Sequence, residues 1–178
     1  MLASIPTAII GLAFEDLFEQ LFHSLTAVGV AFACTGLLLR ATRWVADGEH
    51  DVATVPWSTA LWIGLAQGLA ITPGISRSGA TIAVAMLLGV RRDVAVMLSF
   101  LMSIPAITGA VLLKLRDVEL GSSDPTQLLV GSGAAMVTGY AALVLLVALV
   151  RRGRFADFSW YLAVVSVVAL GLGLSGLA

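Results

Sequence analysis

The stretch from Gln67 to Thr81 introduces polar chemistry into an otherwise apolar sequence. It reads Gln-Gly-Leu-Ala-Ile-Thr-Pro-Gly-Ile-Ser-Arg-Ser-Gly-Ala-Thr, with one cation, Arg77, among four hydroxyl side chains. A cation inside an apolar segment is unfavourable unless it has a partner or a function. A guanidinium offers a planar set of donors that suits phosphate oxygens. The stretch therefore predicts a phosphate-binding site.

The order of residues indicates how the backbone would form this site. Pro73 is expected to stop the incoming helix, and Gly74 to allow a tight turn. Ser76 or Ser78 can cap the outgoing helix, and the sequence leaves both open. The free N–H groups at the start of that helix would point at the bound anion.

Three further side chains are expected near the turn. Arg77 supplies the charge, and Thr81 lies about one helical turn beyond it, so that both can face one cavity. Gln67, on the preceding helix, can reach the same site as a neutral donor or acceptor. The structural alternative is that Arg77 only pairs with a carboxylate or with backbone carbonyls.

Other polar residues give weaker signals. Glu15 and Glu19 share one helix face, which could suit a metal or an acid–base pair, but their amphipathic setting favours a solvated acidic loop. His23 and His50 lack metal-ligand spacing to a second histidine or cysteine. We therefore assign no residue to a metal.

Composition indicates an integral membrane protein. The chain has 178 residues, of which 59% are hydrophobic and 12% charged, with a mean hydropathy of +1.01. Soluble domains carry about 25% charged residues. The net charge of −1 gives no reason to expect a nucleic-acid partner.

The apolar segments predict an all-α, polytopic helix bundle that forms a single domain over residues 1–178. A spanning helix needs ~20 apolar residues, and four segments approach or reach that length: 24–39, 94–113, 127–150 and 158–178. The segment 2–14 is too short to span, and it is either a shallow interfacial helix or part of a longer span.

Residues 58–90 are expected to form a re-entrant helical hairpin. Its first arm, 58–72, would measure ~22 Å and its second, 79–90, ~18 Å at 1.5 Å per residue. Neither arm crosses a ~30 Å hydrocarbon core alone. Irregular backbone at membrane depth requires surrounding protein or a watery cavity.

The arginines predict the orientation of the bundle. If the hairpin enters and leaves by one face, seven arginines fall on one side, which the positive-inside rule makes cytoplasmic; they are Arg40, Arg43, Arg91, Arg92, Arg151, Arg152 and Arg154. The opposite side receives most of the acidic groups, namely Glu15, Asp16, Glu19, Asp117, Glu119 and Asp124. A hairpin whose two arms both cross the membrane would place the same loops on the same sides.

The run from Pro73 to Thr81, preceded by Gln67-Gly68-Leu69, closely resembles a signature of the undecaprenyl-diphosphate phosphatase family, also called bacitracin-resistance proteins. Fainter similarity covers the rest of the chain, including the run Ser-Phe-Leu-Met-Ser-Ile-Pro at 99–105. The resemblance implies an inverted-repeat fold, of which this chain would hold about half to two-thirds.

The resemblance also implies an activity. The family removes the terminal phosphate of undecaprenyl diphosphate in the cell membrane of bacteria, which recycles the carrier lipid for cell-wall synthesis. By resemblance Ser76, Arg77 and Thr81 are catalytic, with Ser76 as nucleophile or phosphate contact. The substrate-binding residues would be Gln67, Gly74, Ser78 and Gly79. A divalent cation, magnesium or calcium, is implied as cofactor, and a homodimer is left open.

One part of the family pattern has no counterpart here. Family members carry an earlier re-entrant loop with a glutamate pair and a Pro-x-Ser-Ser-x-Gly-His run, which would supply the general base. The chain is therefore expected to be the carboxyl-terminal part of such a protein. Two alternatives stay open: a flippase or transporter of polyprenyl phosphate, and a non-catalytic remnant that associates with a partner chain.

Overall fold

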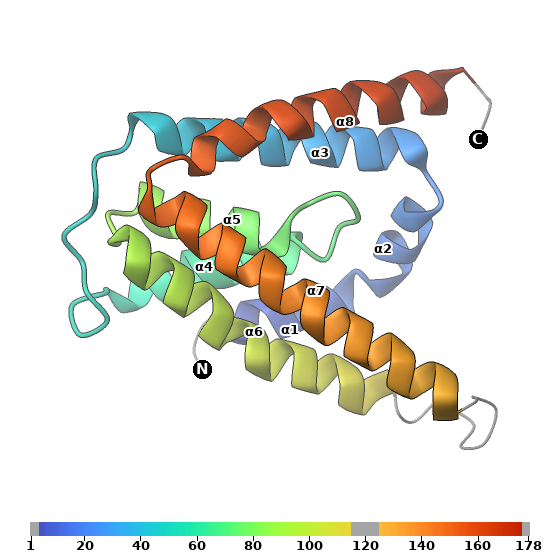
Figure 1. Ribbon diagram of the computed structural model, residues 1–178, viewed down its shortest axis with the longest axis horizontal. Coiled ribbons are helices and arrows are strands. Elements are labelled where there is room, and N and C mark those ends of the chain that lie inside the picture. Colours follow the sequence, from blue (N-terminus) through green and yellow to red (C-terminus); the bar gives the residue numbers. More distant parts are fainter. Residues whose placement is uncertain (1–3, 115–124, 176–178) are drawn as a thin grey trace.

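Helices form most of the backbone in the computed structural model, which describes residues 4–114 and 125–175 (Figure 1). In chain order the elements are α1 (Ser4–Ala13), α2 (Glu15–Phe22), α3 (Leu25–Ala41), the 3-10 turn η1 (Thr42–Trp44), α4 (Trp57–Leu69), α5 (Arg77–Leu87), α6 (Arg92–Lys114), α7 (Pro125–Arg151), the 3-10 turn η2 (Phe155–Asp157) and α8 (Phe158–Leu174). The predicted all-α class is confirmed for these residues.

Four helical segments are long and apolar enough to cross a membrane: 25–44, 92–112, 126–151 and 155–174. They coincide with the four predicted spans and differ from them by a few residues at the ends. The chain is therefore a multi-pass membrane protein. The last residues of the fourth predicted span, 176–178, lie outside the described residues.

The amino-terminal segment forms two short helices that meet at Phe14. Helix α1 has 10 residues, about 15 Å of helix, and packs against α4. The acidic group, expected in a solvated loop, instead begins α2, with Glu15 and Asp16 in its first turn, where the helix dipole favours negative charge. Glu15, Asp16 and Glu19 are all exposed.

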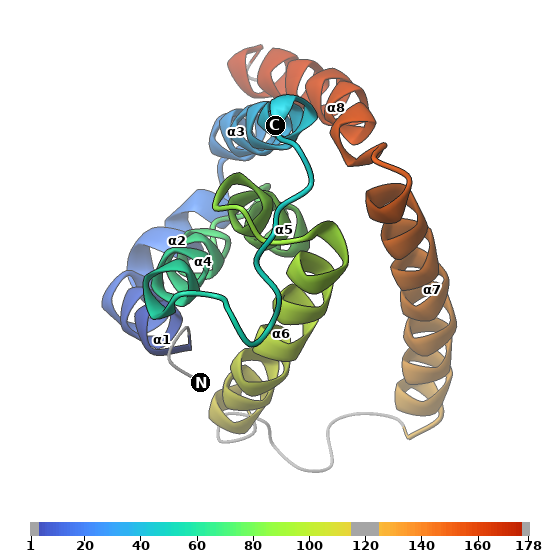
Figure 2. The same cartoon turned by 90° about the vertical axis from the view of Figure 1, so that its left-hand side faces the viewer.

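Helices α3 and α8 lie side by side and antiparallel (Figures 1 and 2). Small residues allow the close approach: a Cβ added at Gly29 would come within 2.8 Å of Leu170. The Ser166 hydroxyl also donates to the Gly29 carbonyl at 2.8 Å. Contacts of this kind, small residues with an interhelical hydrogen bond, hold membrane helices together where lipid removes the hydrophobic driving force.

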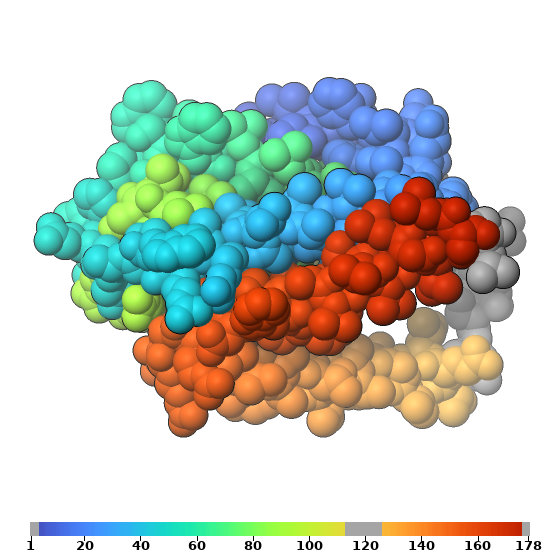
Figure 3. All heavy atoms as spheres, turned by 90° about the horizontal axis from the view of Figure 1, so that it is seen from above, coloured from blue at the N-terminus to red at the C-terminus, as the bar shows by residue number. Residues whose placement is uncertain are grey.

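Helix α7 stands apart from the rest of the bundle. Most of its side chains are exposed, and only 6% of the most apolar window of this span is buried. Figure 3 shows α7 and α8 diverging from their connection with open space between them. Apolar residues around the whole circumference of an exposed helix are expected where the helix faces lipid.

Helix α5 is the centre of the fold. It packs against α3, α4 and α6, and three of its side chains, Ile82, Ala83 and Ala85, are 0% exposed. The alanines allow neighbouring helices to approach closely. Its amino-terminal end, which carries Arg77, is thus fixed by packing on several sides.

The two ends of the α4–α5 hairpin are joined by backbone hydrogen bonds. The His50 N–H donates to the Gly89 carbonyl, and the Arg91 N–H to the His50 carbonyl, each at 3.1 Å. The loop that precedes α4 therefore lies beside the turn that follows α5. The hairpin begins and ends at the same end of the bundle.

The seven arginines predicted for the cytoplasmic side lie in the segments at that end, which we call the arginine end. The carboxyl-terminal ends of α3 and α7 and the start of α6 lie together there, whereas α2 lies at the opposite end (Figure 1). The 3-10 turns η1 and η2, which follow α3 and α7, contact each other. Asp117, Glu119 and Asp124, predicted for the opposite side, lie outside the described residues.

Candidate active site at the tip of the hairpin

The tip of the hairpin is a tight turn over residues 72–75. The Ile75 N–H donates to the Thr72 carbonyl at 3.1 Å, and Gly74 has a φ of +92°. Proline at the second position and a positive φ at the third are the features of a type II turn, which strongly favours glycine at the third position. Helix α4 ends at Leu69, four residues before Pro73, so the turn is separate from the helix end.

Ser76 begins the outgoing helix. Its side-chain oxygen accepts a hydrogen bond from the Gly79 N–H at 3.1 Å, and its backbone carbonyl accepts from the Ala80 N–H at 2.8 Å. The sequence left Ser76 and Ser78 as alternative caps, and the structure identifies Ser76. A Cβ at Gly79 would lie 2.8 Å from the Ser76 Oγ, so this cap favours glycine at position 79.

Arg77 and Ser78 occupy the first turn of α5, and both side chains are half-buried. The guanidinium Nη2 of Arg77 lies 3.5 Å from the Ser103 carbonyl of α6, a long and therefore weak contact. No carboxylate pairs with Arg77 in the described part of the chain. The alternative that Arg77 serves only to pair with a carboxylate or with backbone carbonyls is thus met only in part, by one carbonyl at the limit of hydrogen bonding.

Helix α3 supports the turn from one side. The Thr35 Oγ1 accepts from the Ser76 N–H at 3.3 Å and lies 3.4 Å from the Gly74 carbonyl and 3.0 Å from the Ala31 carbonyl. Thr35 was not predicted from the sequence, because threonine is common in apolar helices and this one lies far from the signature in the chain. The one feature of the sequence that could have indicated this role is a hydroxyl side chain near the middle of an apolar span.

Thr81 points away from the turn and into the core. It is 1% exposed, and its hydroxyl lies 2.6 Å from the Ser99 hydroxyl of α6 and 2.8 Å from the Arg77 carbonyl. The run 99–105 resembles the family sequence, but no role was predicted for Ser99 or Ser103 within it. Thr81 thus links the first turn of α5 to α6, and its catalytic role stays a prediction.

Gln67 faces α1. Its side-chain amide is buried and donates to the Thr7 Oγ1 at 3.1 Å, while the Thr7 hydroxyl in turn donates to the Gly64 carbonyl at 3.0 Å. The Gln67 Oε1 is buried without a hydrogen-bond partner. The described contacts of Gln67 therefore lie in the α1–α4 interface, and its role in substrate binding stays a prediction.

The described residues do not gather a metal site. No group of three or more histidine, cysteine, aspartate or glutamate side chains within 4–114 and 125–175 could hold a metal ion. Arg77, Ser76 and Ser78 suit an anion and not a cation. The divalent cation implied by the resemblance stays a prediction.

Replacing Thr35 by valine is expected to lower the free energy of unfolding by about 1–2 kcal/mol, because the partly buried Ser76 N–H loses its acceptor. Unfolding of the detergent-solubilised protein measures this change. Thr108→Val is the matched control, since Thr108 also bonds the carbonyl four residues back, at 2.8 Å, but is exposed. Equal losses in the two variants would contradict a supporting role for Thr35.

Comparison with known proteins agrees with the signature. Residues 1–168 match the family described as Bacitracin resistance protein BacA. A relative from Carboxydothermus hydrogenoformans, named undecaprenyl-diphosphatase, is 40% identical over 178 residues, which cover 97% of this chain and 68% of the relative. A relative of the same name from Desulfatibacillum aliphaticivorans is 43% identical over 173 residues, which cover 95% of this chain and 63% of the relative.

A shorter relative matches almost end to end. The undecaprenyl-diphosphatase of Methanothermobacter thermautotrophicus is 38% identical over 178 residues, which cover 98% of each chain. The chain thus spans nearly the whole of this relative but only about two thirds of the two longer ones. The match extends over both the signature at the hairpin tip and the surrounding helices, and the chain belongs to the BacA family of bacitracin resistance proteins.

Proposed function

We propose that the chain hydrolyses undecaprenyl diphosphate to undecaprenyl phosphate and inorganic phosphate, and so recycles the carrier lipid for cell-wall synthesis. The observation that carries the proposal is the half-buried Arg77 in the first turn of a helix capped by Ser76. The name shared by relatives that are about 40% identical supports it.

We further propose that α4 and α5 form a re-entrant hairpin in the membrane. Helix α4 has 13 residues and α5 has 11, so they measure about 20 and 16 Å, less than the ~30 Å hydrocarbon core. The bridge between His50 and Val90 supports entry and exit at one face. The inverted-repeat fold, of which this chain would hold about half to two-thirds, stays a prediction.

The contacts with α3 support a site near mid-membrane. Val28 and Ala31 are the nearest α3 neighbours of Gly74, and Thr35 is that of Ser76. These positions lie about 9–20 Å from the carboxyl end of α3 at 1.5 Å per residue. An amphiphile could present its diphosphate there while its isoprenoid chain stays in lipid.

In the proposed reaction, water adds to the terminal phosphorus, the bond from that phosphorus to the bridging oxygen breaks, and the lipid phosphate leaves. Arg77 would bind non-bridging oxygens and stabilise the charge that develops on them. The backbone N–H groups at the start of α5 would add to this stabilisation. Ser76 keeps its hydroxyl proton for a phosphate oxygen, because its cap bond uses only the oxygen as acceptor.

The described residues do not identify a general base. No carboxylate or imidazole among them is hydrogen-bonded to the Ser76 hydroxyl, and the proposal keeps Ser76 as a phosphate contact and water as the nucleophile. The plasma membrane is the proposed location, with matched relatives from both bacteria and archaea, and a homodimer stays a prediction.

The test is phosphate release by the purified, detergent-solubilised chain. We expect release from undecaprenyl diphosphate and little from inorganic diphosphate, because only the lipid is anchored at the depth of the hairpin tip. Translocation of polyprenyl phosphate in vesicles without any release would favour a transporter. Absence of both would contradict the proposal.

A further inference from the structure

A second candidate site lies at the arginine end, away from the hairpin tip. A cavity of about 530 Å³ opens between α6 and α7. Its floor is apolar and includes Val96 and Met97 from the first turns of α6 and Val147 from the last turns of α7. These positions fall just inside the ends of two membrane spans.

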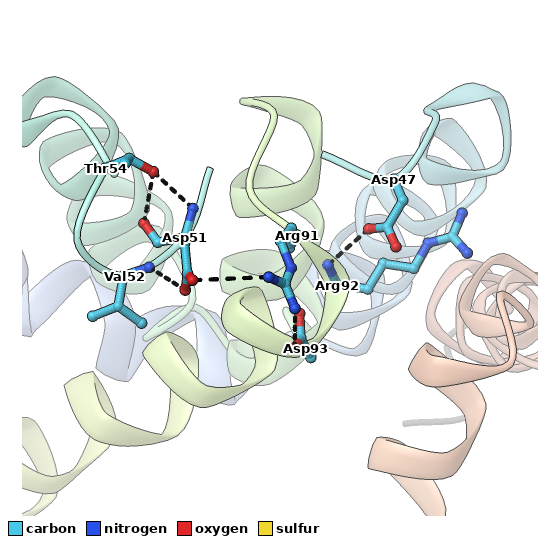
Figure 4. Close-up of polar contacts among 7 residues, drawn as sticks. All are labelled: Asp47, Asp51, Val52, Thr54, Arg91, Arg92 and Asp93. Carbon is cyan, nitrogen blue, oxygen red and sulfur yellow. Dashed lines mark hydrogen bonds and ion pairs between the residues drawn. The ribbon is translucent and has the colours of Figure 1, made fainter. Parts of the chain in front are cut away.

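The rim of the cavity is charged. Arg91 on the rim bonds Asp93 at 2.8 Å and lies 3.8 Å from Asp51 (Figure 4). These three rim residues together carry a net charge of −1, because two carboxylates share one guanidinium. Arg151, the fourth charged residue of the rim, has no acidic partner in the described part of the chain.

Further positive charge flanks this rim. Arg152 follows Arg151 and is exposed, also without an acidic partner among the described residues. The guanidinium of Arg92 points away from the Asp51–Arg91–Asp93 cluster (Figure 4), and its Nε is buried with no hydrogen-bond partner. Asp47 bonds the Arg92 backbone N–H at 3.0 Å. Four arginines (Arg91, Arg92, Arg151 and Arg152) thus face three aspartates (Asp47, Asp51 and Asp93) at this end of α6 and α7, a net charge of +1, and the two arginines without an acidic partner, Arg151 and Arg152, both lie at the end of α7.

We propose that the cavity binds an anionic phospholipid of the bilayer, with its phosphodiester on Arg151 and its upper acyl chains along Val96, Met97 and Val147. A charged rim above an apolar floor matches the boundary between head group and hydrocarbon. Arginine-rich ends of membrane helices face the cytoplasm, and basic pockets between helices on that side bind anionic head groups. The inference does not depend on the proposed hydrolysis.

The test compares lipid binding to the detergent-solubilised protein by native mass spectrometry. We expect phosphatidylglycerol to bind more tightly than phosphatidylcholine. Arg151→Gln is expected to weaken phosphatidylglycerol binding about fivefold, the effect of one cation near a membrane surface. Met97→Trp, which fills the cavity floor, is expected to weaken the binding of both lipids.

Arg43→Gln is the matched control, because Arg43 is exposed at the same end but lies outside the cavity. The Arg43→Gln variant should bind phosphatidylglycerol as tightly as the unmodified chain. Equal weakening in Arg43→Gln and Arg151→Gln would overturn the proposal. So would equal affinity for the two lipids. Displacement of the lipid by millimolar inorganic phosphate would assign the rim to a free anion instead. If Met97→Trp fails to fold, the exposed Arg151 still carries the test.

Discussion

Replacing Arg77 by alanine is expected to lower the rate of phosphate release from undecaprenyl diphosphate by about 10²–10³-fold or more, the usual effect of removing one donor aimed at developing charge. The helix start and the Ser76 cap would persist, since the cap bonds use Ser76, Gly79 and Ala80. The loss would therefore come from the missing cation and not from a collapsed turn.

The stability of the same variant separates a functional arginine from a structural one. Arg77 makes a single 3.5 Å contact with the Ser103 carbonyl, so alanine removes little native bonding and relieves the desolvation of a half-buried cation. We expect thermal unfolding at an unchanged or higher temperature, together with lost activity. Residues that serve function at the expense of stability behave in this way.

Two further variants test this interpretation. Arg77→Lys keeps the charge but loses the planar donor fork, so its activity is expected between those of arginine and alanine. Arg43→Ala, an exposed arginine at the arginine end, should leave phosphate release unchanged. Wild-type turnover in Arg77→Ala, or a large loss of stability without loss of turnover, would contradict the assignment.

The amino-acid sequence predicts the elements of this fold better than the directions of their side chains. Length and hydropathy locate the four spans, because few alternatives accommodate ~20 apolar residues. The turn is predictable because Pro-Gly restricts the backbone locally. The acidic segment was expected as a loop, yet it forms α2, in which Phe18 is buried while Glu15 and Glu19 remain exposed.

Side-chain direction depends on how helices are rotated about their axes, which local sequence does not fix. Gln67 was expected to reach the anion site, but its described hydrogen bond is with Thr7 in α1. Thr81 was expected to face the same cavity as Arg77, but its hydroxyl contacts Ser99 in α6. Thr35 supports the turn from α3, 41 positions from Ser76 in the chain. Each of these contacts joins segments that only the packed bundle brings together.

Replacing Gly74 by alanine is expected to lower the free energy of unfolding by about 2–4 kcal/mol. Two causes add. The φ of +92° at Gly74 is unfavourable for any residue with a Cβ. The added Cβ would also lie 2.6 Å from the Val28 carbonyl oxygen and 2.9 Å from the Ala31 Cβ. Both neighbours belong to α3, which is held against α8 and cannot easily move away.

Gly139→Ala provides the matched control, because a Cβ at Gly139 on the exposed helix α7 would meet nothing within 4 Å. It is expected to leave stability unchanged or raise it slightly, since alanine favours helix over glycine.

Gly74→Ala should also reduce phosphate release, because the turn that fails to form is the one that positions Ser76 and Arg77. If Gly74→Ala is folded at a lower temperature but still releases little phosphate, the position of the turn itself is required for activity. Equal stability of Gly74→Ala and Gly139→Ala would contradict the type II turn and, with it, the arrangement of the anion site.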